Sequence, residues 1–153
     1  LEEASHVRHF VITYKGEAVG SATLTGTKFV SGFTDDLENA SEIEPGLYIG
    51  HENYQNNILA FAPSLLMCDY CFDELGLERL IATVNANNKQ ALSYNERLGY
   101  KEVSRFFTEV SEQTPSADTR VSQQEWVSLA LLRGDYIQAT KQIRNFLSRQ
   151  KSR

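Results

Sequence analysis

The feature that most constrains this chain is a long helical pattern of apolar residues. These residues recur at three- and four-residue spacing and are Ile58, Phe61, Ala62, Leu65, Cys68, Phe72 and Leu75. Such spacing places them on one face of a helix, and Gly76 is a favourable C-terminal stop. Pro63 is compatible with a helix that begins near Leu59, because the N–H groups of a first turn have no intrahelical acceptor. The pattern predicts a long helix that ends at Gly76.

Three extended segments are expected before this helix. Residues 9–14 and 18–24 alternate between apolar and polar side chains, and Lys15-Gly16-Glu17 between them is typical of a hairpin turn. A third strand can begin within residues 40–44 and resume at residues 46–50, stopping near His51.

After the helix, residues 80–84 form a short apolar run typical of a buried strand. Asn87 or Asn88 can then cap a helix that ends at Gly99. Residues 100–110 and 126–132 are predicted to be extended, with a turn-rich stretch between them, and Gly134 or Asp135 opens a terminal helix. This order predicts an α/β (α+β) fold, with a mixed sheet and helices packed on it, as a single domain over residues 1–153.

Composition excludes several classes of protein. With 41% hydrophobic residues and few Gly or Pro in 153 residues, the chain is neither disordered nor fibrous. No apolar run approaches a membrane span, and the first residues lack a signal peptide, so we expect a cytoplasmic protein with no membrane partner. The net charge of -5 disfavours a nucleic-acid partner. Cys68 and Cys71 have no third Cys or His nearby, which favours reduced core thiols and no metal.

The loop before the long helix has the composition of a possible anion site. It contains Gln55, Asn56, Asn57, Ile58, Leu59 and Ala60. Successive backbone N–H groups at the start of a helix form a concave site for a pyrophosphate. Ile58 is β-branched and does not readily take positive φ, so the loop alone is equally compatible with an ordinary polar connection.

A second motif follows the strand at residues 80–84. It consists of Val84, Asn88, Ala91, Leu98, Gly99 and Tyr100. Asn88 could simply cap the helix and Gly99 could simply end it. Taken together with the preceding loop and helix, however, the series resembles the GNAT superfamily of N-acetyltransferases, especially its ribosomal-protein and amino-sugar branch. The family usually has Gly where this chain has Ile58.

The resemblance implies a GNAT-like, mostly antiparallel sheet in which two strands splay apart and hold the pantetheine arm of acetyl-CoA, the expected co-substrate. It assigns cofactor binding to Tyr48, Ile49, Gly50, Gln55, Asn56, Asn57, Ile58, Leu59, Ala60, Asn88 and Asn95. Residues 56–60 would cradle the pyrophosphate, and Asn88 would hydrogen-bond the arm. Asn95 stands where many relatives carry a Tyr that protonates the leaving thiolate. Tyr94 is turned by about 100° on the helix, so we assign it to packing.

Acetyl transfer also requires a base that deprotonates the amine. Thr83 stands at one position where relatives carry a Glu base. The remaining candidates near the third strand are Glu42, Glu44, His51 and Glu52. We favour Glu44 and His51 as the catalytic residues.

The function implied is transfer of an acetyl group from acetyl-CoA to a primary amine by direct attack, with a small-molecule amine or a protein N-terminus as acceptor. Ile58 and Asn95 favour the alternative of a non-catalytic GNAT-fold module that binds acyl-CoA or a protein partner. An unrelated nucleotide-binding α/β domain is disfavoured by the lack of a Gly-rich phosphate fingerprint. The N-terminal strand and helices common in the family are not matched here. We therefore expect a missing N-terminal segment and an incomplete acceptor site, which a second subunit of a homodimer could complete.

Overall fold

The protein folds around one six-stranded sheet. The computed structural model describes residues 5–54 and 61–151. The strand order is β1-β2-β3-β4-β6-β5, and every neighbouring pair is antiparallel except β3 and β4, which are parallel. The elements are β1 (Val7–Tyr14), β2 (Glu17–Phe29), η1 (Leu37–Asn39), β3 (Ala40–Ile49), η2 (Glu52–Tyr54), α1 (Phe61–Asp69), η4 (Tyr70–Glu74), β4 (Arg79–Asn85), α2 (Lys89–Leu98), β5 (Lys101–Gln113), β6 (Thr119–Leu132) and α3 (Arg133–Lys151). The predicted mixed, mostly antiparallel sheet with flanking helices is confirmed.

One face of the sheet carries the core. Alternate residues of β4 and β6 are buried there, while Thr83, between two buried residues of β4, is exposed. The same core contains side chains from all three α-helices, among them Leu65, Leu98 and Tyr136. Since side chains alternate across a strand, the helices cover this face, and Thr83 belongs to the other face.

The predicted turns and helix ends follow the backbone chemistry of their residues. The β1–β2 turn is shorter than expected, with Lys15 and Gly16 at φ 49° and 84° and Glu17 already in β2. Positive φ at both central residues is the type I′ geometry that matches strand twist. Pro63 lies in the first described turn of α1, a position that tolerates proline. The predicted long helix continues as the π-helical turn η4 and stops before Gly76, at φ 67°.

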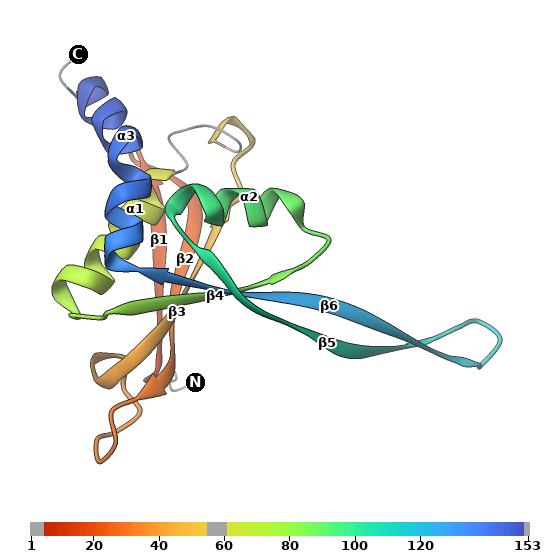
Figure 1. The fold of residues 1–153 in the computed structure, drawn as a ribbon. Helices are drawn as coiled ribbons and strands as arrows, with labels where there is room; N and C mark the ends of the chain where they lie inside the picture. The colour runs from red at the N-terminus through yellow and green to blue at the C-terminus, as the bar shows by residue number, and fades with distance from the viewer. Residues whose placement is uncertain (1–4, 55–60, 152–153) are drawn as a thin grey trace.

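The β5–β6 hairpin is longer than the sequence pattern indicates. β5 runs to Gln113 and β6 begins at Thr119, and Figure 1 shows the pair extending far beyond the rest of the molecule. Nearly all β5 side chains are exposed, so no apolar alternation marks this part of the strands.

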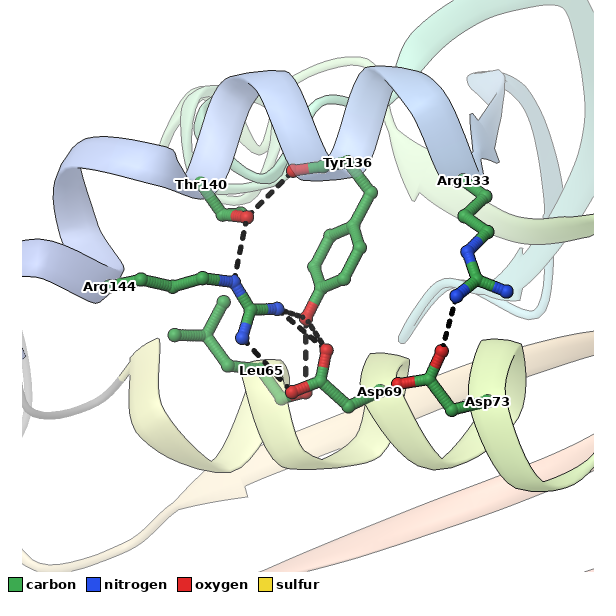
Figure 2. Close-up of polar contacts among 7 residues, drawn as sticks. All are labelled: Leu65, Asp69, Asp73, Arg133, Tyr136, Thr140 and Arg144. Atoms are coloured by element: carbon green, nitrogen blue, oxygen red, sulfur yellow. Dashed lines mark hydrogen bonds and ion pairs between the residues drawn. The ribbon is translucent and has the colours of Figure 1, made fainter.

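The C-terminal helix α3 is joined to α1 and η4 by a polar cluster (Figure 2). Arg144 donates to both carboxylate oxygens of Asp69, at 2.6 and 3.1 Å, and Tyr136 Oη lies 2.7 Å from Asp69 Oδ1. Arg133 reaches Asp73 at 2.7 Å. Within the described residues, no helix is long and apolar enough to span a membrane.

Candidate functional site

The two central strands separate soon after they meet. β3 and β4 are in register at one position, Ile43 opposite Leu80. Beyond it, β3 stays paired with β2 as far as Ile49, and β4 stays paired with β6 as far as Asn85. Figure 1 shows β1, β2 and β3 running at a steep angle to β4, β5 and β6. Residues 44–49 and 81–85 therefore present two strand edges to each other without a ladder between them.

Glu44 lies where this separation begins, one residue after Ile43. Its carboxylate oxygen Oε2 accepts a hydrogen bond from Thr83 Oγ1 of β4 at 3.2 Å. Burial raises the pKa of Glu44, and the neighbouring Glu42 adds to that rise, while hydrogen bonds from Thr83 oppose it. The net pKa lies above the ordinary 4.5. A carboxylate with a raised pKa is better matched to proton abstraction near neutral pH.

Glu42, two residues earlier on β3, has a different environment. Its buried carboxylate lies 3.3 Å from Lys28 Nζ and 3.7 Å from Arg79 Nε. Thr27 Oγ1 also donates to it at 3.0 Å. Two cations and a hydroxyl occupy the lone pairs of this carboxylate, so Glu42 links β3 to its neighbouring strands and is poorly placed as a base.

His51 is not brought together with Glu44. Glu44 and Ile49 are five positions apart on β3, which is about 17 Å at roughly 3.3 Å per residue, and His51 lies beyond that end of β3. Its Nδ1 accepts from Asn53 N at 3.3 Å, and its ring centroid is 5.0 Å from that of Tyr54. Tyr54 in turn contacts Tyr14 at 5.2 Å. His51 therefore belongs to an aromatic cluster beyond β3 and cannot share one reacting atom with Glu44.

Nine of the eleven residues expected to bind the cofactor fall into two groups. Tyr48 and Ile49 form the end of β3, and Gly50 follows directly, so all three lie along the β3 edge of the opening. Gln55, Asn56, Asn57, Ile58, Leu59 and Ala60 lie outside the described residues.

Asn88 is the N-cap of α2. Its Oδ1 accepts a hydrogen bond from Ala91 N at 3.1 Å. Of the two expected caps, Asn87 and Asn88, it is therefore Asn88 that caps the helix. The cap lies three residues after Asn85, the last residue of β4. Asn88 is exposed, so a capping role leaves its side chain accessible to a ligand.

Asn95 and Tyr94 differ as expected for neighbours on a helix. Asn95 Nδ2 donates to Ala91 O, one turn earlier in α2, at 2.9 Å. Tyr94 stacks on Phe61 of α1 with ring centroids 4.5 Å apart, and its hydroxyl hydrogen-bonds Ser64. Burial raises the pKa of Tyr94. The packing role assigned to Tyr94 is confirmed.

Cys68 and Cys71 are free and buried on one face of α1 and η4. Burial raises the pKa of both thiols, that of Cys71 to about 12. A buried thiol that stays protonated is a poor nucleophile and a poor metal ligand. Both cysteines therefore act as core residues.

Thr83 is the residue of this site whose role sequence analysis missed. The resemblance marked its position but gave it no function, because Thr is not a base. The alternation of side chains along residues 80–84 could have shown that Thr83 lies on the face opposite the core. No local pattern, however, pairs Thr83 with Glu44.

Comparisons with known proteins agree with this geometry. Residues 1–101 match a family model described as an acetyltransferase (GNAT) domain. A comparison with curated protein sequences finds no match. Solved structures do match, at identities that show the fold alone.

Three of these structures illustrate the likeness. RimJ from Mycobacterium smegmatis, in complex with CoA-disulfide, has a TM-score of 0.61 and 18% identity, with 85% of this chain and 55% of RimJ covered. A variant of spermidine N-acetyltransferase SpeG from Vibrio cholerae has a TM-score of 0.60 and 19% identity, covering 86% and 69%. Ribosomal-protein-alanine N-acetyltransferase from Brucella melitensis has a TM-score of 0.58 and 14% identity, covering 81% and 67%. The chain spans 64% of another similar structure, a probable acetyltransferase.

Proposed function

The chain belongs to the acetyltransferase (GNAT) domain family, and from that premise we propose that it transfers the acetyl group of acetyl-CoA to a primary amine. The observation that carries this proposal is the position of Glu44, a carboxylate of raised pKa at the point where β3 and β4 separate. In this proposal residues 1–153 act as one N-acyltransferase-like domain.

The opening between β3 and β4 fits the arm of acetyl-CoA. An extended ligand with amide groups can pair with a free strand edge through backbone hydrogen bonds, as an added strand does. We assign the β3 edge of this interaction to Tyr48, Ile49 and Gly50, and a side-chain contact to Asn88. Residues 55–60 are proposed to hold the pyrophosphate at the start of the helix.

In the proposed reaction, Glu44 takes a proton from the acceptor ammonium, directly or through water. The nitrogen lone pair then attacks the thioester carbon, the C–S bond breaks, and the thiolate leaves with the bonding electrons. The thiolate takes the second proton that the nitrogen must lose, directly or through water. No covalent enzyme intermediate forms, and proximity supplies much of the acceleration. A thiol with a pKa near 8.5 leaves without a positioned acid, so Asn95, which cannot donate a proton as Tyr can, is compatible with slow turnover.

For the acceptor, we propose a small-molecule amine or a protein N-terminus. The net charge of -5 favours a cationic partner. Two of the similar structures are a spermidine N-acetyltransferase and a ribosomal-protein-alanine N-acetyltransferase, which span this range of acceptors. We also propose that the protein is cytoplasmic and forms a homodimer, and both proposals are based on the sequence.

The test has two steps. Calorimetry with CoA and acetyl-CoA first measures binding, and a coenzyme-release assay across a panel of amines then measures turnover. Glu44→Gln should lower turnover by about 10² to 10⁴-fold, the usual contribution of a general base, with little change in CoA affinity. Glu109→Gln, at an exposed carboxylate of β5, is the control and should keep wild-type turnover.

Binding of CoA without turnover of any amine would instead support a non-catalytic module. The observation that favours this second function is the engagement of Asn95 Nδ2 with the backbone of its own helix. Absence of binding at millimolar coenzyme by a folded protein would overturn both functions.

A further inference from the structure

A side-chain hydrogen bond crosses the opening between β3 and β4 at the candidate base. Thr83 Oγ1 of β4 donates to Glu44 Oε2 of β3 at 3.2 Å, between residues 39 positions apart in the chain. The two strands are in register only at Ile43 and Leu80, so no ladder of backbone pairs fixes this distance. The Thr83 hydroxyl, together with a hydrogen bond from the Thr83 backbone, therefore ties the Glu44 side chain to β4.

We propose that Thr83 is a positioning residue for Glu44. The hydroxyl holds Oε2 against β4 and leaves Oε1 to receive the proton of the acceptor amine. This inference rests on the proposed function for its catalytic meaning, but the contact it describes can be tested in the protein alone.

Among the groups around Glu44, Thr83 is the one placed to hold its carboxylate. Glu42, on the same strand, repels a second negative charge, and the nearby cations Lys28 and Arg79 are bound to Glu42. The phenol of Tyr100, after α2, also interacts with the Glu44 charge. It is buried and its own pKa is raised, so it stays neutral near neutral pH. Thr25 of β2 is opposite Glu44 in register but carries no charge.

These neighbours determine in which direction the pKa of Glu44 changes when the Thr83 hydroxyl is removed. Burial raises the pKa of Glu44, and the hydrogen bonds from Thr83 lower it. Removing the hydroxyl therefore raises this pKa further, so that less of the carboxylate is ionised at a given pH. Because the Thr83 backbone remains and the hydroxyl is exposed, we expect a shift of roughly half to one pH unit.

The experiment titrates the Glu44 side-chain carboxyl carbon by NMR in ¹³C-labelled protein. The Glu44 signal is identified by its loss in Glu44→Gln. Thr83→Val removes the hydroxyl but keeps the branched shape that suits a strand, and Thr83→Ser keeps a hydroxyl. Thr23→Val is the matched control, because Thr23 lies on neighbouring β2 opposite Gly46 and makes no hydrogen bond to Glu44.

The expected result is an upward shift of the Glu44 titration in Thr83→Val, recovery in Thr83→Ser, and the wild-type curve in Thr23→Val. Where turnover is measurable, the acid limb of kcat/KM should move in the same direction and by the same amount. An unmoved Glu44 titration in Thr83→Val overturns the positioning role, whatever the activity. If the titration shifts while Glu44→Gln leaves turnover unchanged, the contact stands and the catalytic assignment of Glu44 fails.

Discussion

Tyr136 Oη lies 2.7 Å from Asp69 Oδ1, across 67 positions of chain, and links the C-terminal helix α3 to α1 (Figure 2). The same hydroxyl lies 3.0 Å from Leu65 O and accepts from Arg144. Tyr136 is also among the most deeply buried side chains, with its ring 5.4 Å from that of Phe72. The packing of α3 therefore combines an apolar contact with a shared polar cluster.

Removing this hydroxyl should weaken the fold without opening a cavity. For Tyr136→Phe we expect a loss of about 1–2 kcal/mol, because the ring is retained while a hydrogen bond to a charged group is lost. The melting temperature should fall by roughly 2–8 °C, measured by calorimetry. Tyr48→Phe, at an exposed tyrosine of β3, is the control and should melt like the wild type. Equal melting of both variants would show that the hydroxyl adds nothing to stability.

The environment of Asp69 predicts how the free energy of unfolding changes with pH. Burial raises the pKa of Asp69, but hydrogen bonds from Arg144 and Tyr136 lower it by more, so the net pKa lies below the ordinary 3.8. A carboxyl whose folded pKa is depressed stabilises the fold above its unfolded pKa, and this stabilisation is lost as pH falls through the folded pKa. The difference in unfolding free energy between wild type and Asp69→Asn should thus be constant from pH 5 to 7.

Below about pH 4 that difference should shrink, as denaturant unfolding at a series of pH values would show. High salt should reduce the difference at neutral pH as well, because the Asp69 side chain is 36% exposed and its charge is partly screened. A difference as large at pH 3 as at pH 7 contradicts the assignment.

Gly99 joins α2 to the packed surface of α3. It has φ 106°, and an added Cβ would lie 2.7 Å from the Asp135 carbonyl oxygen. Gly99→Ala should therefore cost about 2–4 kcal/mol, from backbone strain together with overpacking. Chemical denaturation measures the cost. Gly134→Ala, with no atom within 4 Å and no positive φ, should be nearly neutral. Gly76 has φ 67° and no atom within 4 Å of an added Cβ, so Gly76→Ala measures the cost of backbone strain without overpacking.

Asn88 can be tested for a ligand role separately from its capping role. Aspartate caps a helix about as well as asparagine but cannot donate an amide hydrogen bond. Asn88→Asp should therefore keep the wild-type melting temperature while CoA affinity, measured by calorimetry, falls several-fold. Asn87→Asp places the same charge one residue earlier and away from the cap, and it should have the smaller effect. Unchanged affinity in Asn88→Asp would leave Asn88 as a cap only.

The sequence by itself determined the elements and much of their order. Residues 80–84 predict the buried strand β4 because their apolar run is local, and Asn88 and Gly99 mark the ends of α2 through backbone chemistry that acts within one turn. The two motifs identified the family, and they placed Glu44 among four candidate bases. They favoured Glu44 and His51 equally, because the partners that distinguish these two residues do not follow from local pattern.

Only the tertiary structure decided those partners. Glu42 meets Lys28 and Arg79, while Glu44 meets Thr83, because β3 and β4 pair in parallel at one position and then separate. The register of two strands joined through a long helix is set by packing of the whole core. A side-chain pattern that repeats every two or 3.6 residues carries no information about contacts 39 or 67 positions apart.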